Sequence, residues 1–384
     1  LAIMVLPPEE LADSARGLDI DGELSGVSSP DDAASASVDP ADTPGDIRQT
    51  GRRAGYDLHL VDLDLGSLQG KAGPVETASG VELFATPEQA KAYRTDVLGA
   101  YGRFVGKEIS PAVKLVRAEP EDVDVGSEAT LVRSTLTGDG FVVHSTSVDF
   151  RVDRVVGTVL LSRADDRDVS DEAVRLAQAL EHRIRDAAAG SLDDTPVQID
   201  GARRAAPAKA PKGAQDLDGY ALATADLPAG TFVDDEEYAG EQDGLRFRRS
   251  FVVGLRKIGG SQVASLESAV VRTAGPRAAL SGVVQLALVL SGPQGPAFFT
   301  QVYEQGGRFR PRDVRVAVVQ VPAMPTGFIA FVRFASPLGK VESALGVVAV
   351  GRHVGRITVV SPAGRLKPAD VARLLYAQAR RMSR

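Results

Sequence analysis

The sequence predicts an α+β protein of two similar tandem domains, each an antiparallel sheet packed by helices on one face. Three observations predict this class: alternating strands joined by short glycine turns, amphipathic helices between them, and a pattern that occurs twice. The chain has 384 residues, of which 43% are apolar, enough for two hydrophobic cores. It has no cysteine, which excludes disulfides, thiolate metal sites and thiol nucleophiles.

The clearest repeat consists of a glycine turn, a buried strand, a polar loop and a closing helix. The segment "RVVGTVLLS…AVRLAQALEHRIR" matches "RHVGRITVVS…VARLLYAQARRM", and Gly157 and Arg175 have the same spacing as Gly355 and Arg373. Both closing segments carry an apolar stripe at helical spacing. Earlier anchors match as well, "MVLPPEELA" with "YALATADLP" and "ELFATPEQA" with "VVRTAGPRAA". We therefore interpret the chain as a duplication.

Within the first copy, apolar periodicity predicts the elements in order. A short helix at Pro8–Arg16 precedes a strand near Tyr56–Leu65, the segment "GVELFAT" and a helix over Pro87–Val105. The strands "ATLVRSTL", 141–153 and the one through Gly157 follow, and the closing helix ends the copy. The helix from Pro87 is justified by a stripe formed by Ala90, Tyr93, Val97, Tyr101 and Phe104. Short glycine turns between the strands indicate antiparallel pairing.

Composition sets the domain boundaries. An Ala-, Pro- and Lys-rich run over 189–215 predicts a semi-extended linker between domains at 1–188 and 216–384. An insertion rich in Ser, Asp, Ala and Pro at 26–46 predicts an exposed flexible loop. Residues 1–190 hold 34 of the 51 acidic but 19 of the 44 basic residues, so the first domain is acidic and the second basic. The asymmetry favours anionic partners for the second domain and a contact between the two domains.

One candidate site is a polar cluster in "YDLHLVDLDL", formed by Asp57, His59, Asp62 and Asp64. Asp57 and His59 share one face of a strand, and a bulge at Leu60–Val61 would bring all four side chains to the polar side. Two interpretations stay open, a solvated sheet face and a metal or acid–base site. The second would make the protein a carboxylate-dependent hydrolase or isomerase.

The other candidate site is a set of arginines in the second copy. "LRFRRSFVVGLRK" and "RFRPRDVRV" alternate arginine with apolar residues, which places the arginines along one exposed strand face. Such a face is either a charged surface that resists aggregation or a docking surface for an anionic ligand, a phospholipid headgroup or an acidic partner. The residues are Arg246, Arg248, Arg308, Arg310 and Arg312.

Known catalytic and cofactor signatures do not occur in the sequence. There is no HExxH, Walker loop, GxSxG or complete GxGxxG motif. "DIDG" at 19–22 lacks the acidic first and last positions of a calcium loop and predicts a turn. "TGFIAFVRF" at 326–334 is similar to an RNA-binding signature, but Ile329 splits its aromatic residues between two faces of a strand. We therefore assign no catalytic residue, cofactor or metal, and we interpret "TGFIAFVRF" as a core strand rather than an RNA-binding surface.

Four short segments, "VLPPEELA", "ATADLPAG", "ELFATPEQAKAY" and "DVARLLYAQARR", carry a family resemblance. They resemble extracytoplasmic sensor and lipoprotein domains of actinobacteria, of the kinase-linked sensor and Mog1/PsbP-like lipoprotein types. One departure is that the kinase sensor domains carry disulfides, whereas this chain has no cysteine. The resemblance implies a secreted or envelope-anchored, non-catalytic module, and it supplies no catalytic residues.

The ends and the hydropathy bear on location. The sequence has no apolar stretch long enough to span a bilayer, and it begins at Leu1 rather than Met. We expect an extracytoplasmic or cell-envelope protein whose leader is removed, with a cytoplasmic location as the alternative. The leading hypothesis is a non-catalytic tandem-domain protein that binds an unknown small ligand or protein partner. The alternatives are the hydrolase or isomerase, and binding of anionic lipid or nucleic acid through the second domain, so membrane-surface association stays open.

Overall fold

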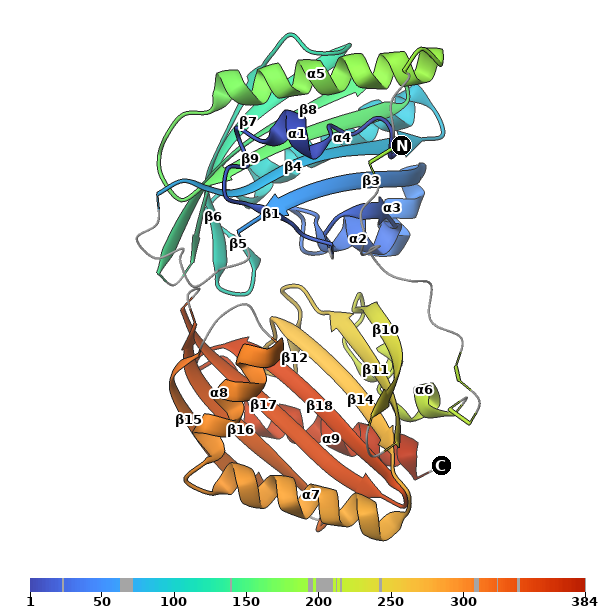
Figure 1. Ribbon diagram of the computed structural model, residues 1–384, viewed down its shortest axis with the longest axis vertical. Coiled ribbons are helices and arrows are strands. Elements are labelled where there is room, and N and C mark those ends of the chain that lie inside the picture. The colour runs from blue at the N-terminus through green and yellow to red at the C-terminus, as the bar shows by residue number, and fades with distance from the viewer. Residues whose placement is uncertain are drawn as a thin grey trace. The chain divides into compact units, whose positions relative to one another are not determined.

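The chain divides into two compact units, Leu1–Arg204 and Ala205–Arg384 (Figure 1). The division falls inside the segment predicted as a linker, much of which lies outside the described residues. Both units combine helices with antiparallel sheets, which confirms the predicted α+β class. The computed structural model describes residues 1–22, 24–62, 72–138, 140–192, 196–197, 210–211, 213–214, 216–241, 244–306, 311–322, 324–336 and 339–383.

The first unit is built on one sheet with the strand order β1-β3-β4-β9-β8-β7-β6-β5, and β2 pairs with β3. Its strands are β1 (Asp19–Ile20), β2 (Gly26–Ser28), β3 (Arg52–Val61), β4 (Pro74–Phe84), β5 (Glu108–Ser110), β6 (Val113–Asp122), β7 (Glu128–Gly138), β8 (Phe141–Val152) and β9 (Val155–Arg163). Its helices are α1 (Pro8–Leu11), α2 (Pro30–Ser35), α3 (Pro44–Gln49), α4 (Pro87–Phe104) and α5 (Ser170–Ala189).

The second unit is built on a sheet with the order β10-β11-β14-β18-β17-β16-β15, beside a small β12-β13 pair. Its strands are β10 (Phe232–Glu241), β11 (Gly244–Val252), β12 (Lys257–Ile258), β13 (Ser261–Gln262), β14 (Ser265–Arg272), β15 (Arg312–Gln320), β16 (Gly327–Ser336), β17 (Gly339–Val350) and β18 (His353–Pro362). Its α-helices are α6 (Leu217–Tyr220), α7 (Pro276–Ser291), α8 (Gly295–Gly306) and α9 (Pro368–Met382).

The topology supports the duplication. The order β3-β4-β9-β8-β7-β6 in the first sheet is repeated as β11-β14-β18-β17-β16-β15 in the second. The register is repeated too, because Phe150 pairs with Gly157 and Val348 pairs with Gly355. The two glycines on which the sequence match rests therefore occupy equivalent places in their sheets.

The long helices begin and end where local chemistry dictates. Thr86 caps α4 by accepting a hydrogen bond from the Gln89 backbone N–H at 3.2 Å, and Pro87 takes the first helical position. α5 ends at Gly190, whose φ of 70° is the left-handed conformation that glycine adopts readily. α1 is shorter than predicted and ends at Leu11. The two long helices predicted for the first copy, α4 and α5, lie at the places that periodicity indicates.

Helices lie on both faces of each sheet. The closing helix α5 packs over the apolar face that contains Val148 and Phe150, and α9 packs over the corresponding face that contains Ile357 and Val359. α4 covers the opposite face of the first sheet, and α7 with α8 covers the opposite face of the second (Figure 1). The prediction of helices on one face of each sheet is therefore wrong in this respect, because the stripes of α4 and α5 pack on opposite faces of the first sheet.

The segment "TGFIAFVRF" forms most of β16, which lies between β17 and the edge strand β15. Phe328 and Phe334 lie under α7 and α8, whereas Ile329 and Phe331 lie on the side of α9. Phe328 and Phe334 are buried, at 3% and 4% exposure, so their rings are not presented for stacking on bases.

The expectation of a flexible loop over 26–46 is wrong for this segment, which contains β2, α2 and the start of α3. Ser29 and Asp32 form a capping box at α2, and Thr43 and Asp46 form another at α3. Proline follows each cap at the first helical turn. The Ser, Asp and Pro composition that is typical of loops here supplies the start signals of two short helices.

Candidate functional site

A cavity of about 370 Å³ lies in the first unit, against the sheet face covered by α4. Strands β3, β4, β8 and β9 line it from the sheet, α4 lines it from one side, and the α2–α3 segment lines it from the other. Among its lining residues His59 is the one basic side chain. Eight carboxylates line it: Asp32, Asp39, Asp42, Asp46, Asp57, Glu82, Asp96 and Asp149.

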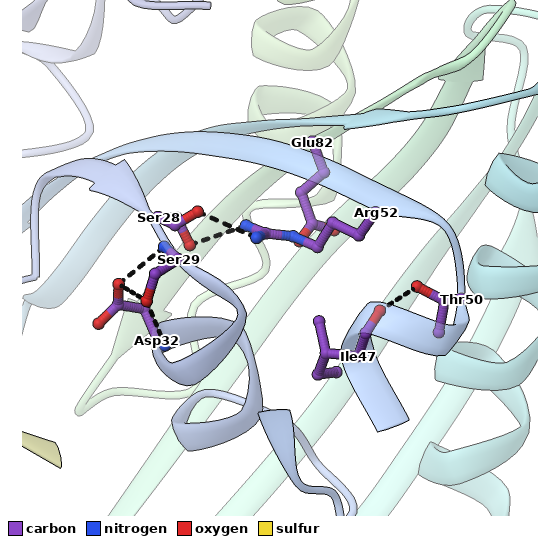
Figure 2. A network of polar contacts seen from close by, with 7 residues as sticks. All are labelled: Ser28, Ser29, Asp32, Ile47, Thr50, Arg52 and Glu82. Atoms are coloured by element: carbon purple, nitrogen blue, oxygen red, sulfur yellow. Dashed lines mark hydrogen bonds and ion pairs between the residues drawn. The ribbon is translucent and has the colours of Figure 1, made fainter. Parts of the chain in front are cut away.

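The α2–α3 segment is fastened to the sheet by Arg52 (Figure 2). The guanidinium donates to the Ser28 carbonyl and the Ser28 hydroxyl, both at 2.9 Å, and to Glu82 Oε1 at 2.5 Å. The Arg52 side chain is 1% exposed, so these bonds form away from water. One buried cation thus joins β2, which precedes α2, to β4 in the sheet.

The α2–α3 segment is also joined to α4. Arg103 Nη1 lies 3.4 Å from Asp96 on its own helix, and its Nη2 lies 3.7 Å from Asp39 of the segment. Within the segment, the Ser37 hydroxyl donates to Asp42 Oδ2 at 2.5 Å. These contacts place Asp39, Asp42 and Asp96 together at one side of the cavity.

Three of the carboxyls have raised pKa values. Burial raises the pKa of Asp149, which accepts a hydrogen bond from Thr158 Oγ1 at 2.7 Å that acts in the opposite direction. Burial also raises the pKa of Glu82, partly offset by the charge of Arg52. Burial raises the pKa of Asp42, and the nearby acidic groups at one side of the cavity add to it. The cavity therefore disfavours its own negative charge, which a bound cation would offset.

Two tyrosines of α4 complete the wall. Burial raises the pKa of Tyr101 to about 12, and burial followed by the charge of Glu82 raises the pKa of Tyr93 well above its ordinary value. Both hydroxyls therefore stay protonated at neutral pH. The Tyr93 ring packs on Phe84 with centroids 4.9 Å apart, which fixes its position against the sheet.

The structure brings together part of the predicted polar cluster. Asp57 and His59 line the cavity, and His59 Nδ1 lies 2.7 Å from Glu76 Oε1 on the neighbouring strand. Asp62 is buried after the end of β3 and is not among the cavity-lining residues. Asp64 lies outside the described residues. Sequence reasoning missed the other carboxylates of the cavity, and for Glu82 and Asp149 the available signal was a carboxylate between apolar residues of a strand.

The predicted arginines lie at different places in the second unit. Arg248 on β11 pairs with Asp235 at 2.5 Å, Glu237 at 3.2 Å and Glu267 at 3.5 Å, and Arg246 lies 3.6 Å from Glu237. Arg312 is exposed at the start of β15, on the opposite side of the strand order. Arg308 and Arg310 lie outside the described residues. The anionic-partner surface stays a prediction.

In the part of the chain that the structure describes, no group of three His, Cys, Asp or Glu side chains is placed to hold a metal ion. None of the helices described there is by itself long and apolar enough to cross a membrane.

Neither a protein-family model nor a curated protein matches the chain. Among solved structures, the extracellular domain of PknH from Mycobacterium tuberculosis is 16% identical, with 48% of this chain and 94% of that chain covered and a TM-score of 0.31. PA94, a Pseudomonas aeruginosa protein of unknown function, is 16% identical, with 34% and 81% covered and a TM-score of 0.19. The immunity protein TplEi of the same organism is 13% identical, with 84% and 92% covered and a TM-score of 0.17. One similar structure is thus a kinase extracellular domain, and these TM-scores support no statement about function.

Proposed function

We propose that the chain is a non-catalytic binding protein whose first unit holds a small organic cation in the acidic cavity. The observation that carries the proposal is the cavity itself, in which eight carboxylates and one histidine line about 370 Å³. That volume suits a small molecule. The resemblance of the sequence to sensor and lipoprotein domains supports an extracytoplasmic location, where the cavity would sample ligands outside the cell.

The pattern of partners indicates which carboxylates are open to a ligand. Glu82 is paired with Arg52, and Asp39 and Asp96 are paired with Arg103. In contrast, Asp42 and Asp149 accept hydrogen bonds from hydroxyl groups. Among the residues that the structure describes, these are the side-chain hydrogen bonds of the two carboxylates. Burial raises the pKa of Asp149 and the charge of Arg94 lowers it, but the Arg94 Nε donates to the Asp149 backbone carbonyl, at 3.1 Å. A ligand ammonium or guanidinium group would give both carboxylates a directly bonded cation.

The lining also indicates that the cation is organic. Val97, Ala100 and Leu160 give the cavity an apolar side, and Tyr93 and Tyr101 add aromatic rings. Apolar and aromatic walls favour an alkyl or aromatic body behind the charged group. A bare metal ion is disfavoured, because the described carboxylates do not converge in metal-holding groups.

A thermal-shift panel tests the proposal on the full chain. Alkylamines, diamines and alkylguanidines are compared with the corresponding alcohols and carboxylates. At a ligand concentration about 100 times Kd, a cationic ligand raises the unfolding midpoint of the first unit by about 5 °C or more. Asp149→Asn weakens that binding about tenfold, whereas Asp13→Asn, a carboxylate 90% exposed and away from the cavity, leaves it unchanged. Equal shifts with neutral and cationic compounds contradict the proposal.

A second candidate function is the carboxylate-dependent hydrolase or isomerase. The observation in its favour is that Asp149 and Glu82, both with raised pKa, line the same cavity, a combination that is common among general acids. The two functions are separated by incubating the protein with each ligand that stabilises it and recovering the ligand after denaturation. An unchanged ligand supports binding alone, and a converted ligand supports catalysis.

A further inference from the structure

The helix pair α7–α8 of the second unit has an apolar outer face. Leu280, Val284 and Leu288 follow one row of α7 and are 44%, 48% and 67% exposed. Exposed apolar residues of this size rarely gather on a surface without a partner. We call the set the apolar helix face, and its members are Leu280, Val284, Leu288, Val289, Phe298 and Val302.

The opposite side of α7 is apolar as well. Ala279, Val283 and Leu290 are buried against the sheet, where they meet Phe328 and Val347. A helix that is apolar all round is normally buried all round. α7 satisfies that expectation on the sheet side only, and its equivalent α4 in the first unit carries a polar outer face, so the duplication does not require an apolar one.

Two exposed arginines lie near the N-terminal end of α7, next to the apolar helix face. Arg277 is exposed and lies three residues before Leu280, about one helical turn away on the same side of α7. Arg352 is exposed in the β17–β18 turn, and its carbonyl accepts a hydrogen bond at 2.9 Å from Thr273, just before α7. Among the described residues, neither arginine has an ion pair. The sequence from 268 to 303 contains no Asp or Glu.

We propose that the second unit docks on anionic membrane surfaces through the apolar helix face, with Arg277 and Arg352 contacting lipid headgroups. Charge complementarity selects this occupant, because two arginines lie at the N-terminal end of α7 and the face contains no carboxylate. A second copy of the chain is disfavoured, since a two-fold interface would bring the same arginines toward one another. The proposal is independent of the ligand cavity.

The helix geometry favours lying on the membrane rather than crossing it. α7 and the first part of α8, Gly295–Val302, have enough apolar length for a span only as a pair, and that pair is bent by 108°. A bent pair whose inner side is packed on a sheet can insert its outer side chains at the headgroup boundary while the backbone stays in place.

Vesicle flotation of the full chain tests the proposal. Wild type floats with phosphatidylcholine vesicles that contain phosphatidylserine, does so less at high salt, and does not float with phosphatidylcholine alone. Val284→Ser with Leu288→Ser lowers the apparent affinity about tenfold or more. Arg277→Gln and Arg352→Gln each lower it about fivefold.

A matched control separates docking from misfolding. Val319→Ser removes an apolar residue that is 49% exposed on β15, outside the apolar helix face, and leaves flotation unchanged. Melting curves show that each variant is folded. Absence of flotation for wild type, equal flotation with neutral vesicles, or flotation of the double serine variant at the wild-type level overturns the proposal. A dimer seen by light scattering and lost in that variant, without vesicle binding, overturns it in favour of self-association.

Discussion

The two units share a strand order but differ in chemistry on the sheet face that α4 covers in one and α7 in the other. Asp57 pairs with Gly80 in the first unit, and Arg248 pairs with Ala269 at the equivalent place in the second. Asp149 pairs with Thr158, and its equivalent Val347 pairs with Arg356. The first unit thus gathers carboxylates around a cavity, whereas Val347 of the second packs in a hydrophobic core.

This difference shows which features the fold itself does not require. The second unit forms the same sheet with Val347 where the first has a buried carboxyl of raised pKa. A buried acid that lowers stability and that the equivalent position replaces by an apolar residue is more simply explained by function than by folding. Leu288 of α7 is the converse case, an apolar side chain that is exposed to water. It too is more simply explained by function than by folding.

The largest expected effect concerns the arginines that fasten peripheral segments to each sheet. Arg52→Met leaves Glu82 buried without its cation and costs the first unit about 3–5 kcal/mol. Arg249 is the analogue in the second unit, where it donates to Glu236 and to the Leu222 carbonyl, but its partner is 25% exposed. Arg249→Met therefore costs about 1 kcal/mol. Chemical denaturation, monitored by amide hydrogen exchange in each unit, measures the loss of unfolding free energy in both variants.

A second variant distinguishes the loss of charge at Arg52 from the loss of packing. Adding Glu82→Gln to Arg52→Met removes the buried charge, and part of the lost stability returns. If the double variant is as unstable as the single one, packing of the Arg52 side chain, rather than its charge, fastens the α2–α3 segment.

The next effect compares the equivalent glycines. A Cβ on Gly157 would lie 2.4 Å from the ring of Phe150, which is fully buried, so Gly157→Ala costs about 2–3 kcal/mol. A Cβ on Gly355 would lie 2.7 Å from Met382 Sδ, and a flexible methionine can move aside. Gly355→Ala therefore costs about 1 kcal/mol. Urea unfolding of the two variants measures both losses of unfolding free energy. Equal costs contradict the view that the aromatic ring sets the glycine requirement in the first unit.

A smaller effect is expected for Asp149→Asn, which raises the free energy of unfolding instead of lowering it. Its pKa is raised above 3.8, so the native state keeps this proton where the unfolded state has lost it, and wild type loses stability as pH rises through that range. Asp149→Asn cannot ionise, so the variant matches wild type at about pH 3 and exceeds it by about 1 kcal/mol at about pH 7.

Asp168 is the contrasting control for this pH dependence. Hydrogen bonds from the Ser170 side chain and backbone lower its pKa, so its contribution is present above 3.8 and is lost as pH falls through the lowered pKa. Asp168→Asn therefore destabilises the first unit at neutral pH and not in acid. Urea titrations of both variants across pH measure the two slopes, and slopes of the same sign contradict the assignment.

The smallest effect is expected on the apolar helix face. Leu288 is 67% exposed, so Leu288→Gln changes the free energy of unfolding by about 0.5 kcal/mol or less. Urea unfolding measures this change. A loss above about 2 kcal/mol would show that the side chain packs within the protein. The apolar outer side of α7, which α4 lacks, would then serve folding rather than docking.

Local patterns in the sequence predicted much of the secondary structure and the duplication. The apolar stripe of the closing segment predicts α5, and the stripe from Ala90 to Phe104 predicts α4, because both signals lie within one element. The duplication was visible because strand and helix spacings survive divergence. The short helices at 26–46 were missed, since capping residues and loop residues are the same types.

The cavity could be predicted only in part, for a physical reason. Asp57 and His59 are near neighbours in sequence, so alternation placed them on one face. Asp42, Glu82 and Asp149 come from three distant segments and meet only through the pairing of β3, β4, β8 and β9 and the docking of the α2–α3 segment. Composition cannot show that convergence, and the ion pairs of Arg248 depend on strand register in the same way.

The most direct test of the acidic cavity is isothermal titration of the full chain with the organic cation that gives the largest thermal shift. The account predicts one site per chain, affinity that falls about tenfold in Asp149→Asn and is unchanged in Asp13→Asn, and weaker binding as pH falls and the carboxyls take up protons. Binding that is equally strong in Asp149→Asn, or that prefers the neutral analogue of the same ligand, would contradict it.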